Sequence, residues 1–187
     1  MLLLHLCRRA AESSLLSRFG SGARMHAAGY GVGLSYYAAL PPTILPASAS
    51  PGRACWASTR LFSDGSGGWS FLRRAIGVLL FAAGSWKQFE AHRILASLRT
   101  SRPANDHGGY GLPRGGWFEL VSCPHYLAEI VLYIGIVLFQ GVSAGAFLML
   151  LWVVVNLSFT AMATHTWYRK NFIDYPRERR AIIPGIL

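Results

Sequence analysis

The sequence predicts an all-α protein, a polytopic membrane helical bundle. Of its 187 residues, 52% are hydrophobic and only 14% are charged, and the net charge is +10. A soluble domain carries about 25% charged residues, so this chain is too apolar for that class. The positive charges lie outside the apolar stretches, as membrane topology requires. We therefore expect membrane lipid and anionic small molecules as partners, and no nucleic acid.

Residues 1–68 are predicted to form an N-terminal segment with one weak membrane span and a loop rich in Ser, Gly and Pro. The weak span covers residues 26–45, where three glycines and Pro41-Pro42 interrupt the apolar pattern. The arginines and serines near the start resemble a transit peptide. The alternative is that the chain begins inside a longer protein.

Residues 69–187 are predicted to form a C-terminal membrane domain. Its spans are expected at residues 71–86, 125–140 and 144–164, and the last two are the most apolar. About 20 residues cross a bilayer, so the span at 125–140 is slightly short. The uncharged link at 141–145 reads as a turn.

Charge predicts how these spans are oriented. Basic residues are concentrated in the segments 87–116 and 168–187. Two spans separate these segments, so both fall on the same side of the membrane. The positive-inside rule makes that side the cytosol.

Polar side chains follow one face of the span at 125–140. His125, Glu129, Tyr133 and Gln140 are spaced by four, four and seven residues, which places them on one helical face. For Tyr133 and Gln140, hydrogen bonding between helices is the simpler explanation. An ionisable Glu129 inside a membrane span is costly, so we favour a functional role for it.

Two further groups of polar residues share helical faces. Asn156, Thr160, Thr164 and Tyr168 have four-residue spacing, and either hydrogen bonding between helices or a site accounts for them. His165 lies at the membrane exit, as a ligand or as an interfacial residue.

The other group is Gln88, His92 and Arg99, which share a face if the span at 71–86 continues as a helix into the cytosol. Arginine offers a fixed fork for phosphate. A solvated basic face is the alternative.

Several common site motifs are absent. Cys7, Cys55 and Cys123 lack the spacing of metal ligands, so we expect no metal site. No strand precedes the glycines at 108–111, and the nucleotide-binding glycine patterns are missing. No catalytic residue is assigned from the sequence.

Four stretches resemble the steroid 5-alpha-reductase family, and most closely its plant-type polyprenol (polyprenal) reductase branch. They cover about residues 69–187 and comprise residues 86–99, residues 112–119, Ser122-Cys-Pro-His-Tyr-Leu-Ala-Glu129 and residues 168–184. Residues 24–30, and Arg8-Arg9 with Glu12-Ser13, resemble an earlier part of that branch more weakly.

The resemblance implies a C-terminal part of a seven-helix membrane fold that holds NADPH. His92 and His125 stand where steroid-reducing members have acidic and amide residues, which favours a polyprenoid substrate. By motif position, the cofactor-binding residues would be Gln88, His92, Arg99, Tyr110, His125, Glu129, His165 and Tyr168.

The function implied is an NADPH-dependent oxidoreductase acting on the CH-CH group of polyprenol or polyprenal. It would saturate the α-isoprene double bond in dolichol biosynthesis, which supports protein N-glycosylation, as a multi-pass protein of the endoplasmic reticulum membrane. Hydride addition to a carbon–carbon double bond needs a sink for the developing negative charge, and a conjugated aldehyde provides one on its oxygen. We therefore expect polyprenal to be the reacting form.

The family has several helices ahead of the region that matches Arg8, so we expect this chain to be N-terminally truncated. Three alternatives stay open: an inactive truncated reductase, a 3-oxo-steroid or enoyl-lipid reductase, and a non-catalytic membrane protein.

Overall fold

The computed structural model describes residues 1–16, 27, 31, 33–36, 67–100 and 111–185. Within these ranges every regular element is helical, and an isolated β-bridge joins Val121 to Arg180. The predicted all-α class is therefore confirmed. The elements are α1 (Leu2–Leu15), α4 (Gly68–Thr100), the 3-10 helix η2 (Gly116–Glu119), α5 (Pro124–Gln140) and α6 (Ala144–Asn171).

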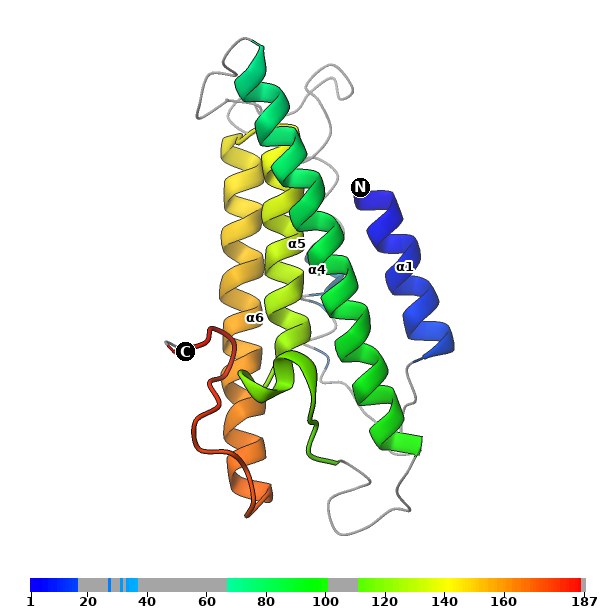
Figure 1. The fold of residues 1–187 in the computed structure, drawn as a ribbon, viewed down its shortest axis with the longest axis vertical. Coiled ribbons are helices and arrows are strands. Elements are labelled where there is room, and N and C mark those ends of the chain that lie inside the picture. The colour runs from blue at the N-terminus through cyan, green and yellow to red at the C-terminus, as the bar shows by residue number, and fades with distance from the viewer. Residues whose placement is uncertain (17–26, 28–30, 32, 37–66, 101–110, 186–187) are drawn as a thin grey trace.

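Figure 1 shows α4, α5 and α6 side by side, each running opposite to its neighbour in the chain. The shorter α1 lies along α4. The predicted weak span at 26–45 falls almost entirely outside the described residues. The division at residue 68 stays a prediction, because residues 37–66 also lie outside them.

The ends of α5 and α6 follow from local chemistry. Pro124 opens α5, where its missing N–H costs nothing. Gly141 ends this helix with a φ of 98°, a conformation that favours glycine. Ser143 then caps α6 by accepting a hydrogen bond from the Ala146 N–H at 3.2 Å. The predicted turn between these spans is present, and α6 continues past Thr164 to Asn171.

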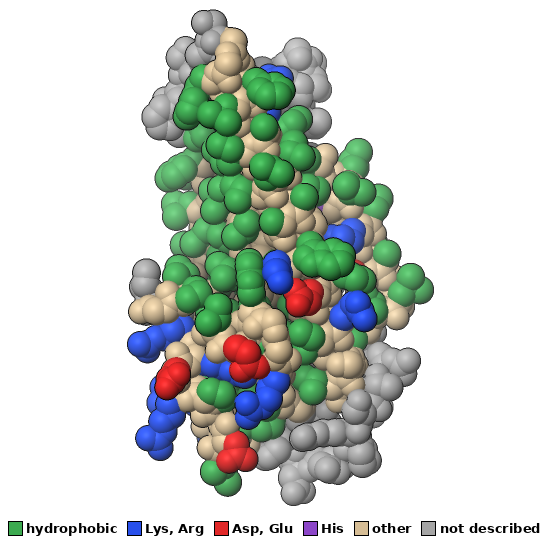
Figure 2. Space-filling view, viewed as in Figure 1, with side chains coloured by type: hydrophobic (Ala, Val, Ile, Leu, Met, Phe, Trp, Pro, Cys, Tyr) green, Lys and Arg blue, Asp and Glu red, His purple; other side chains and the backbone are tan. Residues whose placement is uncertain are grey.

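The outer surface of α6 has the character of a membrane span. Among the described helices, α6 alone is both long and apolar enough to cross a bilayer. Only 22% of its most apolar stretch is buried inside the protein, whereas the core helix of a soluble protein would be mostly buried. Figure 2 shows hydrophobic side chains over most of the upper part of the molecule on the face in view.

Small residues bring α4 and α5 into close contact. A Cβ atom added to Gly84 would lie 2.7 Å from the Ala128 carbonyl oxygen, and one added to Gly77 would lie 2.7 Å from that of Gly135. The two pairs lie seven residues apart on each helix and therefore on one helix face, and small residues on such a face let two membrane helices approach closely. These contacts hold the first half of α4 close to α5 along much of the length of α5.

Charged side chains gather at one end of the bundle. In Figure 2, on the face in view, most Lys, Arg, Asp and Glu side chains lie in the lower half. Figure 1 places the end of α4, η2, the start of α5 and the end of α6 there. The described parts of both basic segments therefore share one end, as the sequence predicted. Arg73 lies toward the opposite end, where it donates to the Leu138 carbonyl near the end of α5.

The C-terminal tail returns to this charged end and binds the start of α5. The Ser122 N–H donates to the Arg180 carbonyl at 2.8 Å, and the Cys123 N–H donates to that of Ala181 at 3.1 Å. In return the Arg180 N–H donates to Leu120 at 3.2 Å. Backbone contacts thus hold the tail beside the loop that precedes α5.

Candidate functional site

A cavity of about 420 Å³ lies between α1, α4, α5 and α6. Its lining is unusually polar for the inside of a membrane bundle. One part is lined by side chains that carry charge or can be protonated, and another part is aromatic. The ionisable part comprises His5, Arg9, His92, His125 and Glu129, and the amide of Gln88 lies beside Glu129.

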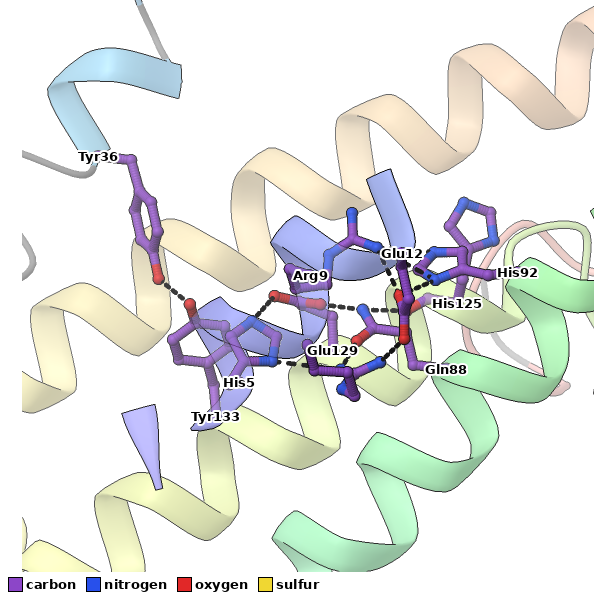
Figure 3. Close-up of polar contacts among 10 residues, drawn as sticks. His5, Arg9, Glu12, Tyr36, Gln88, His92, His125, Glu129 and Tyr133 are labelled. Carbon is purple, nitrogen blue, oxygen red and sulfur yellow. Dashed lines mark hydrogen bonds and ion pairs between the residues drawn. The ribbon is translucent and has the colours of Figure 1, made fainter. Parts of the chain in front are cut away.

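Glu129 of α5 is the carboxylate of the cavity wall. Its Oε2 accepts a hydrogen bond from Gln88 Nε2 of α4, and its Oε1 lies 3.1 Å from His5 Nε2 of α1. A buried carboxylate needs such partners to offset the loss of water. Three helices therefore hold this one group in place (Figure 3).

The partners of His5 assign its tautomer. Arg8 Nη2 lies 3.3 Å from His5 Nδ1. Since a guanidinium only donates, Nδ1 accepts, and the ring proton lies on Nε2, which faces Glu129. Arg8 also donates to Gln88 Oε1. Arg8 therefore orients both groups that donate to Glu129.

A second carboxylate, Glu12 of α1, is 4% exposed and lies behind the cavity wall. Arg8 donates to its Oε1, and Arg9 Nη1 lies 3.0 Å from its Oε2. His92 Nδ1 of α4 lies 2.7 Å from the same Oε2. Glu12 thus joins two arginines of its own helix to a histidine of α4.

His125 leaves one polar atom unsatisfied. Its Nδ1 is buried and has no hydrogen-bond partner in the described part of the chain. Its ring lies 5.6 Å from that of His92 and 4.1 Å from that of Tyr126. A buried group without a partner is costly. This atom belongs to a residue that lines the cavity.

The aromatic part of the cavity comes from Tyr36, Tyr133 and Trp152. Tyr36 stacks on Trp152 with ring centres 5.1 Å apart, and its hydroxyl donates to that of Tyr133. Asn156 and Thr160 of α6 also line the cavity, and the Thr160 hydroxyl donates to the Asn156 carbonyl at 2.9 Å. An apolar, flat ligand suits this wall.

The structure brings together four of the predicted cofactor-binding residues, Gln88, His92, His125 and Glu129, on facing parts of α4 and α5. Arg99 belongs to α4, and its side chain lies outside the described part. Tyr110 also lies outside the described residues. α4 runs from Gly68 to Thr100, so the span at 71–86 continues as one helix, which is the condition under which Gln88, His92 and Arg99 share a face.

The other two predicted residues, His165 and Tyr168, contact the C-terminal tail instead of lining this cavity. Ser122 Oγ lies 2.6 Å from His165 Nδ1 and 3.0 Å from the Arg180 carbonyl. Tyr175 bonds both Ser122 and His165, and stacks on Tyr168 with ring centres 5.9 Å apart. Burial raises the pKa of Tyr175, so it stays a neutral hydroxyl at pH 7. The cluster fixes the tail to α6.

Arg179 makes a second attachment of the tail. Its side chain is 1% exposed, with Nη1 donating to the Pro113 carbonyl at 2.9 Å and Nη2 lying 3.3 Å from Glu119 Oε2. The Gly115 N–H donates to Glu119 Oε1 at 2.6 Å. That hydrogen bond, and then Arg179, hold the pKa of Glu119 below its usual range. The loop before η2 is thereby tied to the tail.

Sequence reasoning missed the part that α1 plays in the site. His5, Arg9 and Glu12 have spacings of four and three, so they share one helical face. That pattern was the available signal, but their partners on α4 and α5 lie about 80 or more residues away. Asn156 and Thr160 were proposed as a polar face, and they do line the cavity.

Comparison with known proteins points to the same family as the sequence motifs do. A family model described as 3-oxo-5-alpha-steroid 4-dehydrogenase matches residues 56–187. Polyprenal reductase 1 of Oryza sativa subsp. indica is 36% identical, over 98% of this chain and 56% of its own length. Polyprenal reductase 1 of Arabidopsis thaliana is 33% identical, over 98% of this chain and 62% of its own. The Danio rerio polyprenal reductase is 34% identical, over 100% and 59%.

The chain thus spans a little over half the length of these curated relatives. Their similarity extends over nearly the whole chain, beyond the residues 69–187 on which the motifs rest, and so takes in α1. The chain therefore belongs to the steroid 5-alpha-reductase family, a family of membrane enzymes, and it is similar to polyprenal reductases.

Proposed function

We propose that this chain carries the cofactor half of a reductase that uses NADPH to saturate the α-isoprene double bond of polyprenal. The relatives named polyprenal reductase support the substrate class, and the family supports redox chemistry. The reaction would serve dolichol biosynthesis, and thereby protein N-glycosylation, in the endoplasmic reticulum membrane, where the polyprenoid is dissolved in lipid. The apolar outer face of α6 supports a membrane location, and the multi-pass arrangement is part of the proposal.

The observation that carries the proposal is the Glu129 carboxylate, held by Gln88 and His5 on the wall of the cavity. Each Glu129 oxygen has two lone pairs, so the carboxylate can accept further hydrogen bonds from a ligand. The carboxamide of a nicotinamide offers two N–H donors. The unsatisfied Nδ1 of His125 adds a second polar contact one helical turn away. These residues fit the polar end of a nicotinamide.

When bound, the cofactor supplies a hydride, and the protein supplies position and charge. We assign Glu129 to orienting the nicotinamide amide and not to acid–base chemistry. Gln88 and His5 hold the carboxylate, and the aromatic wall of Tyr36, Tyr133 and Trp152 excludes water. Exclusion of water strengthens each of these polar contacts.

The remaining predicted cofactor residues keep their proposed roles. Arg99 offers a guanidinium for a nucleotide phosphate, which would favour NADPH over NADH. Tyr110, His165 and Tyr168 are proposed to lie near the same cofactor. His165 and Tyr168 contact the tail, so the tail cluster and the cofactor would then share a boundary.

The test is substrate and cofactor profiling in microsomes that contain the chain, with microsomes from cells without it as the control. We expect loss of polyprenal to depend on NADPH and to exceed loss of a 3-oxo-steroid. Arg99→Ala should raise the KM for NADPH and leave that for polyprenal unchanged. Faster reduction of the steroid would overturn the substrate assignment. No reduction of either substrate would favour a non-catalytic role for this chain.

A further inference from the structure

We propose that Glu12 is a positioning residue for the cavity, which fixes the tautomer of His92 and holds Arg9 on the wall. This inference rests on the proposed function in one respect, because the ligand used to test it is NADPH. Glu12 does not line the cavity. Two of its hydrogen-bond partners line the cavity themselves, and a third partner contacts a residue that does.

The partners of Glu12 reach the cavity by two routes. Arg9 and His92 contact Glu12 and line the cavity themselves. Arg8 contacts Glu12 and donates to Gln88, which in turn donates to Glu129. Figure 3 shows Glu12 with Arg9 and His92, and Gln88 beside Glu129. A single side chain of α1 thus stands behind polar groups on α1, α4 and α5.

The hydrogen bonds around His92 define where its proton lies. A carboxylate only accepts, so the 2.7 Å contact between Glu12 Oε2 and His92 Nδ1 requires a proton on Nδ1. Arg9 only donates, and Nδ1 is then no acceptor for it. Arg9 Nη1 lies 3.1 Å from Nδ1 and 3.3 Å from Nε2, so it packs against the ring, and its own bond to Glu12 holds it there. Glu12 selects the Nδ1–H form of a neutral His92, and it holds Arg9 beside that ring through a hydrogen bond of its own.

Charge alone makes the opposite prediction for a mutant. Glu12→Gln removes a negative charge 3.0 Å from Arg9, so the cavity becomes more positive. If Glu12 acted only through its charge, an anionic nucleotide would bind the mutant more tightly. If Glu12 acts by positioning, glutamine offers a single acceptor oxygen to Arg8, Arg9 and His92, and the weaker hold on these groups lowers affinity despite the added positive charge. The sign of the change separates the two explanations.

The binding experiment measures the Kd for NADPH of the full chain in lipid nanodiscs, by energy transfer from tryptophan to the bound nucleotide. Trp152 lines the cavity and serves as a donor. We expect Glu12→Gln to weaken binding about tenfold, the factor that one hydrogen bond to a charged group contributes. The matched control is Glu90→Gln on α4, whose carboxylate lies outside the cavity and pairs with Lys87 at 2.8 Å. It removes the same charge and should leave Kd unchanged.

A second measurement reads the positioning without any ligand. Nitrogen NMR of the chain labelled with ¹⁵N-histidine reports the tautomer of each ring, and His92→Asn identifies the signals of His92. We expect an Nδ1–H ring in the wild type and a mixture of tautomers in Glu12→Gln.

Three results would overturn the inference: unchanged or tighter NADPH binding by Glu12→Gln, a wild-type His92 that is doubly protonated or protonated on Nε2, or a His92 tautomer that Glu12→Gln leaves unchanged. Absence of NADPH binding by the wild-type chain would instead refute the proposed cofactor. In that case the tautomer measurement alone decides whether Glu12 positions His92.

Discussion

Replacing Glu129 by glutamine tests the cavity with almost no change in shape. The carboxylate has two neighbours in place, His5 Nε2 at 3.1 Å and Gln88 Nε2. Both nitrogens are donors, and each faces one oxygen of the Glu129 carboxylate. In Glu129→Gln one oxygen becomes an NH₂ group that meets a donor instead of offering an acceptor. One hydrogen bond is lost, and the other no longer involves a charge.

The magnitude follows from these two bonds. A hydrogen bond to a charged group contributes about 1.5–3 kcal/mol. If only the lower value is lost from the orientation of the nicotinamide, turnover falls at least about tenfold, which corresponds to about 1.4 kcal/mol in the barrier. The protein should still insert and accumulate, because the side chain keeps its volume.

The assay follows NADPH-dependent reduction of polyprenal in microsomes, normalised to the amount of chain present. Glu90→Gln is the matched control, since it removes a carboxylate from the same bundle outside the cavity. Wild-type turnover in Glu129→Gln at an equal protein level would refute the proposed role. Glu129 would then be a structural contact between α1, α4 and α5.

Three further predictions concern packing, acid sensitivity and topology. Gly84→Leu inserts a side chain where even a Cβ would lie 2.7 Å from a backbone oxygen of α5, so the protein should lose about 1–3 kcal/mol of stability and melt earlier in detergent. The lowered pKa of Glu119 stabilises the fold at neutral pH, and this contribution is lost as the pH falls from the ordinary carboxyl pKa through the lowered one. Because Glu119 is half exposed, the effect is small, and Glu119→Gln should flatten the dependence of melting temperature on pH in that acidic window. Single cysteines placed in 87–116 and 168–187 should react with an impermeant reagent outside sealed microsomes, and protection of either segment would contradict a shared cytosolic side.

The apolar spans could be read from the sequence because their signal is local. Unbroken apolar runs predicted α5 and most of α6, and four-residue spacing placed His125 and Glu129 on one face. Gln88 and His92 followed from the same periodicity in α4. Such patterns show which residues share a helix face. They do not show which helix that face meets.

The contribution of α1 depends on such a long-range contact. Its arginines and serines also suit a transit peptide, and nothing local ties Glu12 to His92 on α4. The position of His165 outside the cavity also depends on a long-range contact. Its ring contacts Ser122 and Tyr175, and this contact depends on the return of the tail, which no helical periodicity encodes.

The most direct test of the proposed reaction follows the hydrogen that NADPH transfers to polyprenal. Polyprenal is reduced in microsomes containing the chain with NADPH that carries deuterium at the transferable position, and the product is analysed by mass spectrometry and NMR. The account predicts deuterium on the β-carbon of the α-isoprene unit, with the aldehyde retained and the double bond saturated. Deuterium on the carbonyl carbon, with the double bond intact, would contradict it and identify the chain as an aldehyde reductase.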